Sequence, residues 1–194
     1  MQAPESRFRK WTAALFADTS GSQMLEFAVA LPLLVVFVVG IFDFGEAFNT
    51  KQKLTNITRE GARFASALPT NDLDAIGTPA SVTAIRDLVD SHLLTARMND
   101  CGLAGQAGVN GPALTWTYTA AGGGCAAPLV LVIDRSYSFP TTIGGYTFNV
   151  ISTHVTMQYP YRWQFNKVIG FLVAGATYPG VSQIKTEAIV PNME

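Results

Sequence analysis

The sequence predicts an α+β fold in which a long N-terminal helix, membrane-spanning and then amphipathic, packs on an antiparallel sheet of about four strands. An uncharged apolar run extends from Phe27 to Phe42, and apolar residues recur at helical spacing after it as far as Leu68. From residue 113 onward the chain is rich in β-branched and aromatic residues in alternating patterns, which is typical of strands. A helix covering one face of such a sheet is a layered α+β arrangement.

The length and composition of the chain suit one domain plus a membrane anchor. Charged residues make up 14% of the chain, whereas about 25% is usual for a soluble domain. The 13 Lys and Arg residues form no basic patch, so we expect no nucleic-acid partner. The chain contains no common hydrolase or zinc-enzyme motif, and His92 and His154 lack the spacing of metal ligands. We therefore expect no enzyme activity, no cofactor and no metal site.

Residues 1–21 are interpreted as a cytoplasmic leader, with a short helix expected over residues 7–16. The stretch Asp18 to Gly21 is turn-like and should leave Gly21 accessible. Glu26 follows five residues after this glycine and directly precedes the apolar run. A charge at a membrane boundary costs free energy unless it is paired or hydrated.

A leader, a glycine and a glutamate near the top of a membrane helix form the pattern that a prepilin peptidase recognises. We therefore predict cleavage between Gly21 and Ser22, and an assembly role for Glu26 and Phe27. In this hypothesis Glu26 pairs with the freed α-amine of Ser22 on a neighbouring subunit, because a carboxylate in an apolar setting gains most from a cation. The alternative is that Glu26 is a boundary residue that reaches the membrane interface.

The apolar run from Phe27 to Phe42 is about 24 Å long as a helix, and flanking Met24, Leu25 and Phe44 bring it near the ~20 residues of a bilayer span. A buried core helix is the alternative. Pro32 should remove one hydrogen bond and locally loosen the helix.

Charge on either side of the run predicts the orientation of the protein. Arg7, Arg9 and Lys10 precede it, and Asp43 and Glu46 follow it. The Lys/Arg bias places the N-terminus in the cytoplasm and the rest of the chain across the membrane. The bulky, charged residues after the run also argue against a secretory signal peptide.

The helix is expected to continue beyond the membrane, so that residues 22–68 form one element ending before Pro69. Apolar residues three and four positions apart define a stripe that should pack on a globular domain. Its expected core residues are Leu54, Ile57, Phe64 and Leu68, and polar residues such as Asn56 fill the other positions. Gly61 should allow the sheet or another helix to approach closely.

Residues 69–194 are expected to form the extracytoplasmic α+β domain. After a linker over residues 70–80, a helix should begin at Ser81 and end near Asp100. A change in the phase of alternation predicts a β-bulge near Val150. Strands are expected over residues 113–119, 129–139, 146–159 and 181–190, and a helix or loop on the sheet over residues 165–173.

The two cysteines, Cys101 and Cys125, lie in glycine-rich loops on either side of the first expected strand. The predicted topology places them in an oxidising compartment, which favours a disulfide between them. One pair of cysteines supplies too few ligands for a structural zinc site.

Four motifs resemble the N-terminal pattern of the TadE-like family, the minor pseudopilins of tight-adherence (Flp-type) pilus systems. They are Gly21-x-x-x-x-Glu26-Phe27, Leu31-Pro32, Phe42-Asp43-Phe44-Gly45 and Thr58-Arg59-Glu60-Gly61-Ala62-Arg63-Phe64-Ala65. The resemblance implies a pilin-like fold and a bacterial inner-membrane protein with its C-terminal domain in the periplasm, able to enter the pilus. It also implies as partners a prepilin peptidase, other pilins or pseudopilins, the inner-membrane assembly platform and the lipid bilayer.

Ser22 departs from the Phe or Met common after the cleavage site of type IV pilins, and some family members keep an uncleaved anchor. The alternative function is therefore a single-pass anchor whose outer domain scaffolds a secretion apparatus or binds a ligand. A membrane-tethered enzyme is a third hypothesis. Two interpretations also stay open for Arg59, Glu60 and Arg63, which are either a solvated helix face or residues that bind a partner or clamp the sheet.

Overall fold

The computed structural model describes residues 19–74, 76–164 and 180–193. The expected leader helix over residues 7–16, the flanking Arg7, Arg9 and Lys10, and the expected segment 165–173 lie outside the described residues. The chain divides into two compact units. One contains residues 1–43 and 164–178, and the other, called here the outer domain, contains residues 44–163 and 179–194.

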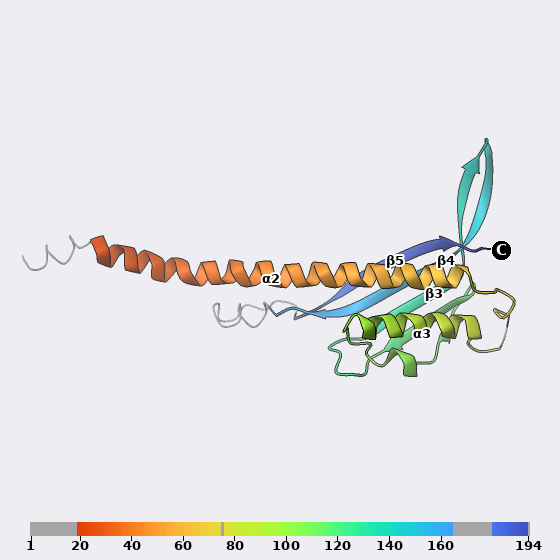
Figure 1. Ribbon diagram of the computed structural model, residues 1–194, viewed down its shortest axis with the longest axis horizontal. Helices are drawn as coiled ribbons and strands as arrows, with labels where there is room; N and C mark the ends of the chain where they lie inside the picture. Colours follow the sequence, from red (N-terminus) through yellow and green to blue (C-terminus); the bar gives the residue numbers. More distant parts are fainter. Residues whose placement is uncertain (1–18, 75, 165–179, 194) are drawn as a thin grey trace, which may run out of the picture. The chain divides into compact units, whose positions relative to one another are not determined.

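Helix α2 (Thr19–Ser66) confirms the long N-terminal helix, which continues through Pro32 without interruption (Figure 1). The turn expected between Asp18 and Gly21 is wrong, because α2 begins at Thr19 and includes Gly21. Thr and Ser favour helix starts, and the penalty of about 1 kcal/mol for a glycine is small against a long continuing helix. Gly21 is nevertheless exposed, and a Cβ atom placed on it would meet nothing within 4 Å.

The first half of α2 is apolar and exposed. None of residues 21–42 is buried, although they include Met24, Phe27 and Phe42. Among the described helices, α2 alone is long and apolar enough to cross a membrane. Such a surface is unfavourable in water and suits a lipid environment.

The second half of α2 belongs to the outer domain and buries one face in its core, as predicted. Leu54 and Ile57 are buried as expected, and Leu68 is partly buried. Phe64 was expected in the core but is 36% exposed. At about 100° per residue, Phe64 is rotated roughly 80° from Leu54, whereas Ala65 is rotated only about 20°. The buried face is completed by Thr58, Gly61, Ala62, Ala65 and Ser66.

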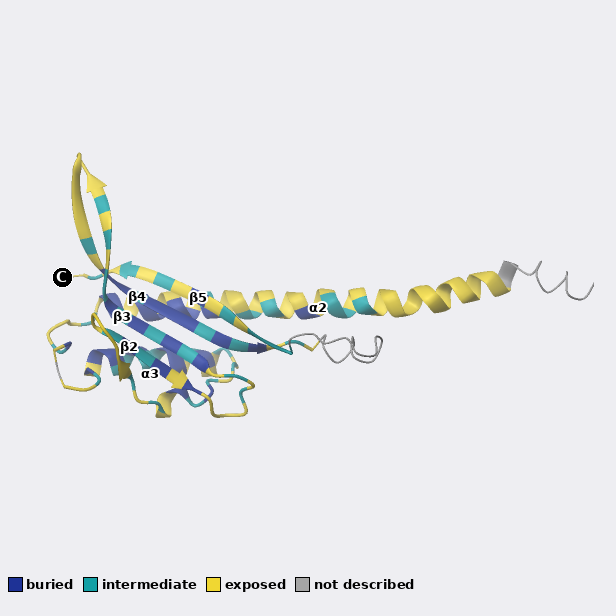
Figure 2. Cartoon of the chain, turned by 180° about the vertical axis from the view of Figure 1, so that it is seen from behind, coloured by how far each residue is buried: buried dark blue, intermediate teal, exposed yellow. Residues whose placement is uncertain are grey.

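The second helix, α3 (Ala80–Thr95), begins where the sequence predicted and buries Val82, Ile85, Val89 and Leu93, but it ends at Thr95 and not near Asp100. It and the second half of α2 cover the same face of the sheet (Figures 1 and 2). The sheet has five antiparallel strands in sequential order. The short 3-10 helix η1 (Leu103–Gly105) precedes them, and the strands are β1 (Val109–Asn110), β2 (Thr115–Ala120), β3 (Leu129–Ile143), β4 (Tyr146–Arg162) and β5 (Val181–Pro191).

The β-bulge lies on β3 and not near Val150 of β4. Register shifts between Asp134 and Tyr137, where Arg135 and Ser136 oppose the single residue Thr153. The change of phase in β4 has another cause: β2 pairs with β3 only as far as Asp134, and β5 pairs with β4 only from Ser152. The β3–β4 hairpin extends beyond these partners, and its Tyr146 and Phe148 are exposed (Figure 2).

Candidate functional site

The predicted cleavage and assembly residues lie together in the first turns of α2. Gly21, Ser22, Glu26 and Phe27 are all exposed. Ser22 and Glu26 are four residues apart and therefore share one helix face. Nothing in the described part of the chain covers this face, so the segment is open to a partner, although the bond after Gly21 is helical and not extended.

Arg59, Glu60 and Arg63 lie on the solvent face of α2. Glu60 and Arg63 form an ion pair of 3.7 Å with side chains 50% and 74% exposed, so the pair contributes little to stability. These residues do not clamp the sheet, and binding to a partner subunit stays a prediction.

A pair of buried threonines joins α2 to the sheet instead. Thr58 donates from Oγ1 to the backbone oxygen of Leu54 at 2.7 Å and contacts Oγ1 of Thr186 on β5 at 2.9 Å. A threonine has one hydroxyl hydrogen, so Thr186 is the donor to Thr58. Thr58 lies four residues from both Leu54 and Ala62, so helical spacing places it on the buried face, but the sequence pattern does not reveal its contact with Thr186.

Gly61 allows close packing of two helices, as expected. A Cβ atom on Gly61 would lie 3.0 Å from Cγ2 of Val89 on α3. The missing side chain of Gly61 therefore allows α3 to approach α2 closely. The sequence had left open whether the sheet or another helix would approach at this glycine.

Arg135 is a buried structural residue that the sequence analysis missed. Its side chain is 1% exposed and donates to the backbone oxygens of Ala65, Leu68 (3.0 Å) and Pro69 (3.3 Å), at the C-terminal end of α2. A cation is favourable there, because the last carbonyls of a helix lack partners and carry partial negative charge. Burial lowers the pKa of the guanidinium, and nearby Asp72 opposes that shift. The available signal was the pattern of β3, in which Arg135 continues the inward series Leu129, Leu131 and Ile133.

The predicted disulfide between Cys101 and Cys125 is present, with Cα atoms 5.6 Å apart. It joins the loop after α3 to the loop between β2 and β3. Asn99 supports the junction, since its Nδ2 donates to the oxygen of Gly123 at 2.7 Å and its Oδ1 accepts from the backbone N–H of Cys101 at 2.9 Å.

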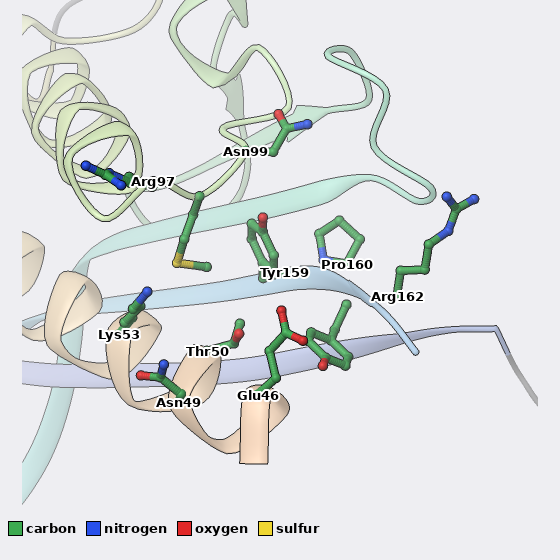
Figure 3. A pocket seen from close by; sticks show the side chains of 11 residues that line it. Glu46, Asn49, Thr50, Lys53, Arg97, Asn99, Tyr159, Pro160 and Arg162 are labelled. Carbon is green, nitrogen blue, oxygen red and sulfur yellow. The ribbon is translucent and has the colours of Figure 1, made fainter. Parts of the chain in front are cut away.

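A polar cleft of about 340 Å³ lies where α2, the segment after α3 and the end of β4 meet (Figure 3). Nζ of Lys53 donates a hydrogen bond to the backbone oxygen of Ala96 at 3.5 Å. Tyr159, another residue of the cleft, has a raised pKa because its side chain is buried. Arg97 and Arg162 point away from one another, so the charges do not converge on one point. Within the described residues, no cluster of three or more His, Cys, Asp or Glu side chains could hold a metal ion. The cleft is lined by Glu46, Asn49, Thr50, Lys53, Arg97, Met98, Asn99, Tyr159, Pro160, Tyr161 and Arg162.

Comparison with known protein families confirms the resemblance drawn from the motifs. Residues 21–63 match the family model of TadE-like proteins. The matched segment is most of α2, and α3 and the sheet lie outside it. Searches of curated proteins and of solved structures found no match to the chain.

Proposed function

We propose that this chain, whose helix α2 carries the TadE-like match, is a minor pseudopilin of a tight-adherence pilus system. One observation supports this most strongly: residues 21–63 match the family model, and in the same helix an exposed apolar half leads directly into a half that packs on an α+β domain. The protein would be held in the bacterial inner membrane by one span and would support pilus assembly without acting as an enzyme.

The charge distribution and the disulfide support one orientation. The charges that flank the run favour a cytoplasmic N-terminus, since Arg7, Arg9 and Lys10 precede it and the acids Asp43 and Glu46 directly follow it. The disulfide between Cys101 and Cys125 belongs to the outer domain, and such bonds persist in oxidising compartments such as the periplasm. Both arguments favour the same side of the membrane for the outer domain.

Cleavage requires that the start of α2 unwinds, because Gly21 is helical and a peptidase binds an extended backbone. A glycine lowers the cost of unwinding, since it weakens a helix by about 1 kcal/mol relative to alanine. Cleavage then frees the α-amine of Ser22, and Glu26 of a neighbouring subunit would pair with it. In this mechanism the exposed Glu26 sets the register between subunits.

The test compares two variants expressed in a strain that carries the pilus system. Gly21→Leu should retain the leader, because its side chain blocks the cleavage site. Glu26→Gln keeps the shape of the side chain but removes the charge, so it should be cleaved and yet be lost from assembly. Mass spectrometry of the membrane-extracted protein reports the leader, and electron microscopy with co-purification of pilins reports assembly.

Two matched substitutions on the same helix serve as controls. Gly45 is exposed and a Cβ atom there meets nothing within 4 Å, so Gly45→Leu should leave cleavage unchanged. Glu46 is an exposed acid of the second half of α2, so Glu46→Gln should assemble normally. Normal cleavage of Gly21→Leu, or normal assembly of Glu26→Gln, would contradict the pseudopilin mechanism. The helical state of Gly21 would then favour the alternative function, an uncleaved anchor whose outer domain scaffolds a secretion apparatus or binds a ligand.

A further inference from the structure

Two exposed aromatic side chains, Phe44 and Phe48, and the partly buried ring of Trp163 form an apolar face on the outer domain. Phe44 and Phe48 are four residues apart on α2 and are 61% and 65% exposed. The ring of Trp163 lies edge-on to that of Phe44, with centroids 5.2 Å apart. The face borders an open, almost wholly apolar cleft of about 560 Å³ that Ile184 and Lys51 also line. Exposed apolar surface of this kind marks an interaction site.

The polar atoms of Trp163 are satisfied within the outer domain. Its Nε1 donates to Oγ of Ser182 at 2.7 Å, and its backbone N–H donates to the oxygen of Gly180 at 3.0 Å. The ring of Tyr161 is also edge-on to the indole, with ring centroids 5.0 Å apart. The indole is therefore fixed with its hydrogen-bonding edge paired and its apolar body beside Phe44. Tryptophans with one paired edge and an apolar body are enriched where membrane meets water.

The sequence places this face at the end of the predicted span. The apolar run ends at Phe42, so Phe44 and Phe48 follow about 3 Å and 9 Å further along α2. The run itself is about 24 Å long, which is shorter than a hydrocarbon core of ~30 Å. A short span is accommodated when flanking residues enter the interface or the bilayer thins. Phe44 and Phe48 are the next apolar aromatic residues available for this.

The charges near the face are compatible with lipid headgroups. Asp43, the first acid after the run, is only 4% exposed and so does not present its carboxylate to lipid. Glu46 is exposed but lines the polar cleft. Lys51 is exposed and lines the apolar cleft, and a long cationic side chain can place its apolar stem in the interface and its charge among phosphates.

We propose that Phe44, Phe48 and Trp163 lie in the interfacial layer of the bilayer and hold the outer domain against the membrane surface. The inference rests on the membrane anchoring in the proposed function, but not on cleavage or pilus assembly. A second copy of the chain or a pilin partner covering the same face is the competing occupant.

The test uses the full chain in lipid nanodiscs made with ordinary or acyl-brominated lipids, which quench nearby tryptophan emission. Leader residue Trp11 is replaced by Phe, which leaves Trp163 and Trp116, and Trp116 is 1% exposed in the core. Brominated lipids should quench the emission, and most of the quenching should be lost in Trp163→Phe. Equal emission in both lipids, from protein that still co-purifies with nanodiscs, would overturn the inference and leave the anchor intact.

A matched pair of probes separates the membrane from a protein partner. In the Trp11→Phe, Trp163→Phe background, Phe48→Trp should be quenched by brominated lipids and Phe64→Trp should not, since both are exposed aromatic positions of α2 but Phe64 lies about 24 Å further from the span. A photo-reactive benzoyl-phenylalanine at position 48 should cross-link to lipid. Cross-linking to a second copy or to a pilin in place of lipid would overturn the proposal. If the chain does not enter nanodiscs, both the membrane anchor and this proposal, which depends on that anchor, would be contradicted.

Discussion

The two halves of helix α2 have surfaces that suit different surroundings. Residues 27–42 are apolar around the whole helix and none of them is buried. Residues 54–66 have one polar and one apolar face, and the apolar face is buried in the core of the outer domain. The buried face of the second half uses small residues, since Gly61, Ala62 and Ala65 let α3 and the sheet approach. A helix that is apolar all round needs lipid or a large core, and one with a stripe needs a single packing surface. One continuous helix can therefore couple a membrane to a folded domain.

The largest expected difference between the two halves is in how much a substitution changes the free energy of unfolding of the outer domain. Ile57 is 5% exposed in the core, so Ile57→Ala should lower the free energy of unfolding by roughly 2–5 kcal/mol. Leu34 is 57% exposed in the first half, so Leu34→Ala should leave this free energy unchanged. Denaturant titration of the full chain in mild detergent, followed by circular dichroism, measures both.

Two further substitutions sharpen the assignment of helix faces. Asn56→Ala changes an exposed residue and should have little effect. Phe64→Ala should cost less than Ile57→Ala, because Phe64 is 36% exposed and lies at the edge of the buried face. Equal losses at Leu34 and Ile57 would mean that the two halves are not distinct in the way described.

The second prediction concerns the point where α2 ends. Arg135→Met keeps much of the side-chain volume but removes the donors to Ala65, Leu68 and Pro69. Because the carbonyls of a helix end lose their partners, the outer domain should be destabilised by about 1.5–3 kcal/mol. Arg63→Met, at an exposed cation on the same helix, should change stability by much less. Similar thermal melting of both variants would contradict a capping role for Arg135.

Sequence reasoning predicted the helix, most of the strands and the TadE-like match of residues 21–63, because each depends on a local pattern. It predicted the disulfide from the expected compartment. The span follows from an uncharged run, and Leu54 and Ile57 follow from helical spacing. Local pattern does not reveal which hydroxyl or cation meets the backbone of a distant segment, so the contacts of Thr58 and Arg135 were missed. Phe64 was misplaced because its hydrophobicity was given more weight than its angle around the helix. The bulge was misplaced because the change of phase in β4 reflects where β2 and β5 stop pairing, which the sequence does not reveal.

The smallest predicted effect tests the polar link between α2 and β5. Thr58 donates to Leu54 and accepts from Thr186, so the two substitutions are not equivalent. Thr58→Val leaves the buried hydroxyl of Thr186 without an acceptor and should cost about 1–2 kcal/mol. Thr186→Val leaves Thr58 still bonded to Leu54 and should cost less than Thr58→Val.

The double variant should be more stable than Thr58→Val alone, because it removes the unpaired hydroxyl. A double-mutant cycle by denaturant titration measures this coupling. Equal single effects that simply add would show that the hydroxyls do not interact, and that apolar packing alone holds this half of α2 to the sheet.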